Sequence, residues 1–133
     1  MASEGRTQTS ALEFLAEVSE KPYRYGFFQT VRRINCFYND KPLTGQSFKP
    51  SDDPIRFTQE PYTFFAPSTI AKLTIDGSDP YPRLSQRFLG LFGPNGPLPL
   101  HLTEYARDRS RHHYDHTLAD FANMFHHRVV SLF

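Results

Sequence analysis

The sequence has no tryptophan, a single cysteine and almost no net charge. One cysteine, Cys36, excludes an internal disulfide and is typical of a reducing compartment, so we expect a cytoplasmic protein. A formal charge of +1, from 15 basic and 14 acidic residues, gives no field that would attract nucleic acid or an anionic membrane surface. Because Cys36 lies among apolar residues of a predicted helix, we expect its thiol to be packed.

Long apolar runs are also absent. No stretch approaches the ~18 apolar residues of a membrane-spanning helix. Residues 1–10 lack the basic segment and apolar segment of a signal peptide. Aliphatic residues are few, and phenylalanine, with 13 residues, dominates the apolar content. Such a chain builds a modest core and leaves aromatic rings to be buried against a partner.

Proline is missing from both ends, since all 11 prolines lie between Pro22 and Pro99. Proline disrupts helix interiors and central strands, so the two ends are predicted to be helical and the middle to hold loops and short strands. Ser10 and Glu13 have the spacing of a capping box, which predicts a helix that begins at Ser10 and ends before Pro22. We expect residues 1–9 to be flexible.

The chain between Gly26 and Pro99 predicts one more helix and a sheet. Apolar residues at helical spacing follow Gly26 up to Phe37 or Tyr38. Short strands are predicted near residues 55–57, 71–75 and 84–88. An antiparallel meander is the simplest way to join them. The fold class is therefore α+β, with N-terminal helices, a small irregular antiparallel sheet, a Gly/Pro-rich loop and two final helices.

The loop from Gly90 to Pro99 contains three glycines and three prolines and is nevertheless apolar. A rigid apolar loop needs a cover, which either the chain's own helices or another chain supplies. A helix is predicted from about Leu100 to Tyr114, and a last one from a Thr117 cap. An apolar stripe is predicted along the last helix. It comprises Leu118, Phe121, Ala122, Phe125, Val129 and Leu132.

The histidines are the candidates for chemistry. His112, His113 and His116 have a spacing at which two of them could bind zinc from one helix face, but no cysteine pair or His-Glu-x-x-His motif accompanies them. A helix-end or interface role is the alternative. Of His126 and His127, one is predicted to face the stripe and the other solvent. No Gly-x-Ser-x-Gly elbow or phosphate loop is present, so an enzyme is not expected.

Several motifs are specific in combination. Residues 27–32 read FFQTVR and residues 87–104 read RFLGLFGPNGPLPLHLTE. Residues 120–133 have the pattern DF-x-x-x-FHHR-x-x-SLF, and PIRF and EP occur within residues 54–61. Together these motifs resemble the TssG family of the bacterial type VI secretion system, also called ImpH or VasB. The resemblance covers nearly all of residues 22–133.

The resemblance implies a structural protein without catalysis or cofactors. Family members form a baseplate wedge with two copies of TssF, bind TssK and TssE, and surround a spike and tube of VgrG and Hcp. It also implies that residues 1–133 are the N-terminal portion of a longer family protein, located in the cytoplasm at the inner face of the envelope. We expect ten residues to contact partner proteins. They are Phe27, Phe28, Leu91, Phe92, Pro94, Pro97, Leu98, Phe121, Phe125 and Val129.

The alternatives from other classes are a small metal-binding module or enzyme built on the histidine cluster, and an adaptor that folds and acts alone. Stoichiometric zinc that is lost on His112→Ala or His116→Ala would favour the first.

Overall fold

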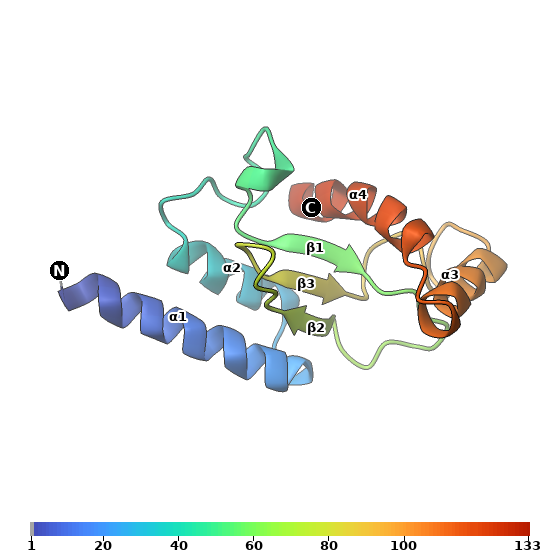
Figure 1. The fold of residues 1–133 in the computed structure, drawn as a ribbon, viewed down its shortest axis with the longest axis horizontal. Helices are drawn as coiled ribbons and strands as arrows, with labels where there is room; N and C mark the ends of the chain where they lie inside the picture. The colour runs from blue at the N-terminus through green and yellow to red at the C-terminus, as the bar shows by residue number, and fades with distance from the viewer. Residues whose placement is uncertain (1) are drawn as a thin grey trace.

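The computed structural model describes residues 2–133 and has the predicted α+β architecture, with a small sheet between two groups of helices (Figure 1). The N-terminal group lies along the apolar face of the sheet, and the C-terminal group lies beside its first strand. The elements in chain order are α1 (Ala2–Glu20), the 3-10 turn η1 (Pro22–Arg24), α2 (Phe27–Phe37), the 3-10 turn η2 (Pro50–Asp52), β1 (Arg56–Gln59), β2 (Ile70–Thr74), β3 (Arg83–Gln86), α3 (Leu100–His112) and α4 (Thr117–Leu132).

The sheet is mixed, so the predicted antiparallel meander is wrong in one of its two pairings. The strand order is β1-β3-β2. β2 and β3 form the expected antiparallel pair, but β1 and β3 are parallel, with Phe57 opposite Leu84. The connection between β1 and β2, residues 60–69, is too long for a tight turn. It lets β3 enter the middle of the sheet, where Leu84 is fully buried.

The first helix begins earlier than predicted. α1 starts at Ala2, so Ser10 lies inside the helix and the capping box does not form. The Thr9 hydroxyl donates to the Gly5 carbonyl oxygen at 2.9 Å, so its hydrogen-bonding group has a partner within the helix. Polar residues in this first part of α1 are therefore compatible with helical structure. The flexibility expected of residues 1–9 stays a prediction. Among the helices of residues 2–133, none combines the length and apolar character needed to cross a membrane.

The main core joins α1 and α2 to one face of the sheet. α2 begins after Gly26 as predicted, and Phe27 and Ile34 point inward. The other face of α2 is exposed and includes Phe28 and Cys36. The prediction that Cys36 is packed is therefore wrong. Ile34 lies on the side of α2 that faces the sheet, and Cys36 lies on the exposed side. The core members are Phe14, Leu15, Val18, Phe27, Ile34, Ile55, Phe57, Ile70, Leu73, Leu84 and Val130.

The junction of the last two helices is held by Asp115. The Arg109 guanidinium donates to Oδ2 of Asp115 through Nε at 3.1 Å and Nη2 at 2.8 Å. Oδ1 accepts from the hydroxyl of Thr117 at 2.6 Å and from its backbone N–H at 3.1 Å. These bonds hold the pKa of Asp115 far below its usual range. α4 begins at Thr117 as expected, but Thr117 is not the cap: His116 holds that position without a side-chain cap bond.

Candidate functional site

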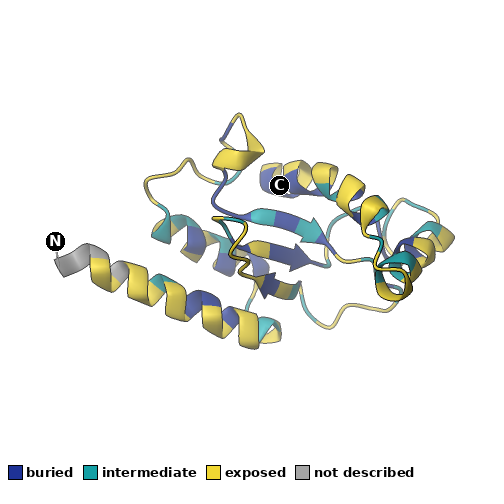
Figure 2. Cartoon of the chain, viewed as in Figure 1, coloured by how far each residue is buried: buried dark blue, intermediate teal, exposed yellow. Residues whose placement is uncertain are grey.

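Helix α4 buries both His126 and His127 and leaves the aromatic part of its predicted stripe exposed. Phe121 is 58% and Phe125 53% exposed, whereas Ala122 of the same stripe is buried. Figure 2 shows the exposed positions along the side of α4 that faces away from the sheet. The side that faces β1 is made of small and hydrogen-bonding residues, and a close approach to a strand favours such side chains over phenyl rings. Phe121, Phe125 and Val129 therefore pack neither on the sheet nor on the Gly/Pro-rich loop within this chain.

His127 is the centre of a buried polar chain. Its Nδ1 accepts the Phe57 backbone N–H at 3.2 Å, and its Nε2–H donates to Oδ2 of Asp53 at 2.9 Å. Asp53 also accepts from the Ser47 hydroxyl at 2.6 Å. All three side chains are buried. Burial lowers the pKa of His127, while Asp53 opposes that shift. The neutral imidazole fits this arrangement, because Nδ1 must remain an acceptor.

The Ser47–Asp53–His127 chain differs from a hydrolase triad. The serine donates to the carboxylate rather than to the imidazole. The second imidazole nitrogen is occupied by a backbone N–H. Neither nitrogen is thus free to take a proton from a nucleophile, and the chain serves to hold α4 against the segment before β1.

His126 joins α4 to the Gly/Pro-rich loop. Its Nε2 accepts the Leu91 backbone N–H at 2.9 Å, and Nδ1–H donates to Oδ1 of Asn123 at 3.0 Å. The same amide oxygen accepts the Gln59 N–H at 3.0 Å. The ring of His126 packs edge-on against Phe92 at 5.7 Å between centroids. Burial lowers the pKa of His126 to about 4, so this ring is neutral near pH 7.

The His126 pKa predicts a pH dependence of stability. The unfolded imidazole protonates near pH 6.5 and the folded one only near 4, so the unfolded state binds more protons in between. The free energy of unfolding therefore falls as pH drops from 6.5 toward 4, by up to about 1.4 kcal/mol per pH unit from this residue. Urea unfolding at pH 7, 6 and 5 measures the slope. His126→Gln should show a smaller slope than the wild-type chain; equal slopes would contradict the assignment.

The loop itself is clasped by buried side chains. Gln59 binds both backbone groups of Phe92, with Oε1 accepting its N–H and Nε2 donating to its carbonyl, each at 2.9 Å. Gly93 has a φ of +100°, and a Cβ there would lie 2.8 Å from the Tyr62 ring. Phe92 is buried, and a second small core forms around it with Ala106 and Ala122. Helices α3 and α4 thus cover Phe92, whereas Pro94 and Pro97 stay exposed, so the chain itself covers only part of the loop.

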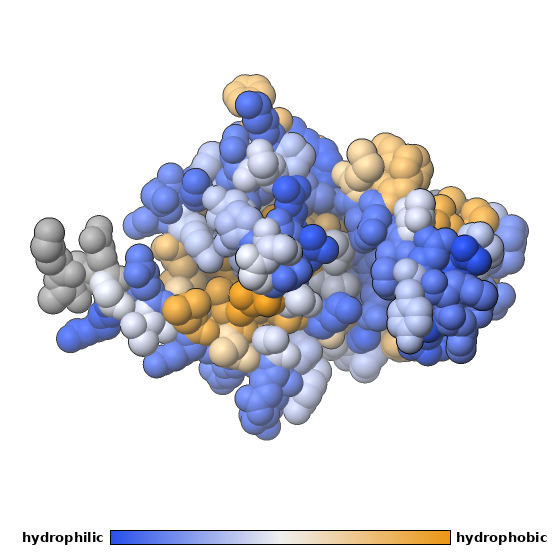
Figure 3. All heavy atoms as spheres, in the orientation of Figure 1, coloured by the Kyte–Doolittle hydropathy of each residue, from blue (hydrophilic) through white to orange (hydrophobic). Residues whose placement is uncertain are grey.

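The predicted contact residues divide into two groups. Phe27 and Phe92 lie in the two cores, so their rings pack within this chain. Leu91 and Leu98 are partly buried against the second core. The remaining six are exposed, and those of α4 contribute to the apolar atoms visible over that helix in Figure 3. They are Phe28, Pro94, Pro97, Phe121, Phe125 and Val129.

Five of the exposed rings form two clusters. Phe121 and Phe125 pack edge-to-face on α4, with centroids 5.5 Å apart. At the other end of α4, Phe133 lies 6.0 Å from Phe28 and 6.1 Å from Phe88. We call the first pair the α4 aromatic face. Since each ring is more than one-third exposed, both clusters leave apolar area in contact with water.

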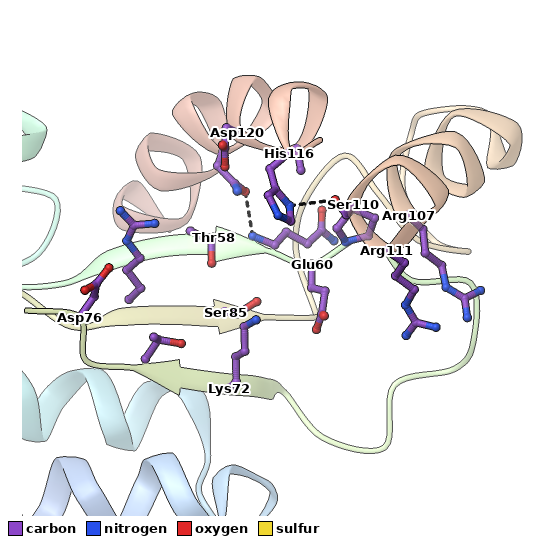
Figure 4. A pocket seen from close by; sticks show the side chains of 16 residues that line it. Thr58, Glu60, Lys72, Asp76, Ser85, Arg107, Ser110, Arg111, His116 and Asp120 are labelled. Carbon is purple, nitrogen blue, oxygen red and sulfur yellow. Dashed lines mark hydrogen bonds between the residues drawn. The ribbon is translucent and has the colours of Figure 1, made fainter. Parts of the chain in front are cut away.

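A polar hollow of about 390 Å³ lies over the other face of the sheet, between the strands and the C-terminal helices (Figure 4). Lys72 and Arg111 line it together with Glu60 and Asp120, so its charges are of both signs. His116 is at its edge, 3.2 Å from the Ser110 hydroxyl. Because the lining carries both positive and negative side chains, it favours neither an anionic nor a cationic ligand.

The histidine cluster does not assemble a metal site within the described chain. His112 and His113 both approach Asp108, each at 3.9 Å, and all three side chains are exposed. His116 turns toward Ser110 instead. No group of three or more histidine, cysteine, aspartate or glutamate residues among those described is arranged to hold a metal ion.

Comparison with known proteins identifies the family. A profile described as "Type VI secretion, TssG" matches residues 21–133. The chain belongs to the TssG family. No curated protein and no solved structure matches it significantly. The resemblance of the sequence motifs to this family is confirmed, and helix α1 lies outside the matched residues.

The side chains that organise this TssG-family fold were not selected from the sequence. No sequence spacing marks the members of this hydrogen-bond network, which are Ser47, Asp53, Gln59 and Asn123. One signal is present in the sequence: Gln59 lies two residues after Phe57 and therefore on the same face of β1, where a buried amide requires hydrogen-bond partners. The joint burial of His126 and His127 differs from the prediction that one of them faces solvent.

Proposed function

We propose that this chain is a structural wedge component of the type VI secretion baseplate, in the cytoplasm at the inner face of the envelope. It would assemble with two copies of TssF and with TssK and TssE, in a platform that VgrG and Hcp complete. Membership of the TssG family supports a role in type VI secretion. The wedge position and the named partners are our proposal.

The α4 aromatic face carries this proposal. Phe121 and Phe125 are exposed, although the same helix buries two histidines. A monomer would have gained stability by burying the phenyl rings, at about 25 cal/mol per Å² of apolar area removed from water. Exposed paired aromatic side chains are typical of residues that dominate a protein interface. We therefore place the TssF contact on this face.

The geometry around the buried histidines supports a non-catalytic role. Both imidazole nitrogens of His126 and both of His127 have hydrogen-bond partners inside the chain. A general base needs a nitrogen within reach of a substrate proton. These nitrogens form hydrogen bonds to a loop, to a strand and to a carboxylate. The two histidines therefore stabilise the tertiary structure of the chain.

The test is binding of purified TssF to the full chain carrying Phe121→Asp and Phe125→Asp. Removing two anchor residues that each contribute about 2 kcal/mol should weaken binding by 100-fold or more. Phe48→Asp is the matched control. Phe48 is a fully exposed phenylalanine that is not part of the α4 aromatic face. Calorimetry measures affinity, and circular dichroism checks folding. Unchanged affinity in the folded double variant would refute the proposed contact.

A further inference from the structure

A second hollow lies beside the Gly/Pro-rich loop. Its volume is about 590 Å³, within the range of ligand pockets. One wall is the loop, with Pro94 and Pro97, and the facing wall is the segment 65–69 with Phe65. Phe65 is 84% exposed at the rim. The lining is partly aromatic, as in the aromatic-lined grooves that bind extended proline-rich peptides, and prolines add further apolar surface.

Arg87 is the single charged residue among those that line this hollow. Its Nε–H is buried and has no acceptor among the described residues. The ion pairs found in residues 2–133 involve other cations, so no carboxylate neutralises this guanidinium. Arg87 is held instead over the ring of Phe64, with Cζ 5.3 Å from the centroid. A partly buried cation without a counter-ion favours an anionic ligand.

The walls of the hollow are fixed before any ligand enters. The Tyr62 hydroxyl donates to the Arg87 carbonyl oxygen, and the Arg87 N–H donates to the Thr69 carbonyl oxygen at 3.0 Å. Gln86 accepts the N–H groups of Phe88 and Leu89 at 3.0 and 2.9 Å. The Thr69 bond holds the 65–69 side, and the bonds from Gln59 to Phe92 hold the loop side. Binding a ligand therefore requires little further ordering of the hollow, which limits the free energy lost on binding.

We propose that this hollow binds an acidic side chain carried on an extended segment of a partner protein, with Arg87 as its counter-ion. The guanidinium offers a planar fork of N–H donors that fits a carboxylate. The exposed prolines and Phe65 offer contact area to the residues on either side of the acidic one. The inference rests on the proposed function in one respect, namely that the chain acts through protein contacts.

Nuclear magnetic resonance on the full chain tests the proposal with two probes, acetyl-Pro-Glu-Pro-amide and acetyl-Pro-Gln-Pro-amide. The glutamate peptide should shift the Arg87 Nε–H signal and the Gly90 and Gly96 amide signals in a saturable way. The glutamine peptide, which has the same shape without the charge, should bind at least tenfold more weakly. Arg87→Met should weaken binding of the glutamate peptide at least tenfold.

Matched variants separate charge loss from misfolding. Arg33 also lies over a ring, that of Phe14 at 4.7 Å, but outside the hollow, so Arg33→Met should leave binding within twofold of wild type. Arg87→Lys keeps the charge without the fork and should weaken binding at least threefold, even if Arg87→Met does not fold. Equal binding of both peptides, no shifts with either, or wild-type binding by Arg87→Lys overturns the proposal. Equally tight binding of free glutarate overturns the protein-segment assignment.

The outcomes are separable from those of the TssF experiment. A chain that binds TssF but not the glutamate peptide refutes the Arg87 site alone. A chain that binds the peptide but not TssF refutes the proposed wedge contact alone, because the α4 aromatic face does not line this hollow.

Discussion

Replacement of His127 by alanine is expected to lower the free energy of unfolding by about 4 kcal/mol, because it leaves a buried carboxylate without its partner. Asp53 is 1% exposed and would keep a single side-chain hydrogen bond, from Ser47. The Phe57 N–H would also lose its acceptor. Urea unfolding at pH 7, followed by circular dichroism, measures the change.

The control for this prediction is His113→Ala, which removes an exposed imidazole from the end of α3 and should change stability by less than about 0.5 kcal/mol. A double-mutant cycle with Asp53→Ala should give a coupling energy of at least about 1 kcal/mol. Additive effects of the two substitutions would show that the Asp53–His127 contact does not hold α4 in place.

Gln59→Met is expected to destabilise the chain by about 3 kcal/mol, since two buried backbone groups of Phe92 would lose their partners at about 1–3 kcal/mol each. Methionine has nearly the shape of glutamine, so the substitution removes hydrogen bonds and leaves little cavity. The side-chain amide of Gln59 also fills the space that a Cβ at Gly90 would need, and Gly90 has a φ of +154°. The loop amides should therefore exchange hydrogen faster in this variant.

The comparison for this substitution is Gln29→Met on the exposed side of α2, which should be within about 0.5 kcal/mol of wild type. Chemical denaturation gives the global stability, and hydrogen exchange at Phe92 reports the loop. If the global loss in Gln59→Met is no larger than in Gln29→Met, the clasp does not stabilise the fold.

Local patterns predicted the elements well where a strong signal marked them. Gly26 before an apolar repeat gave the start of α2 correctly, and the proline-free end gave α4 from Thr117. The antiparallel pairing predicted for neighbouring strands holds for β2 and β3, which a short connection joins. These features depend on neighbours in sequence, where propensity and turn chemistry act directly.

Apart from the capping signals at Ser10 and Thr117, which misled, the features that failed depend on contacts between distant segments. The place of β3 between its neighbours is a choice of topology that strand patterns do not encode. The orientation of α4 followed its apolar periodicity in the prediction, but its buried side is set by hydrogen bonds to β1 and to the loop. A hydrophobic stripe indicates a face that avoids water; it does not say whether this chain or a partner supplies the cover.

Asn123 and His127 lie one helical turn apart and accept two alternate N–H groups of β1, from Gln59 and Phe57. These are the donors that the outer edge of the sheet would otherwise present to a strand of another molecule. On the opposite edge, the Ser19 hydroxyl donates to the Leu73 carbonyl oxygen at 2.9 Å. Side chains of this chain thus occupy backbone groups on both edges of the sheet, which lowers the tendency of two copies to associate through strand pairing.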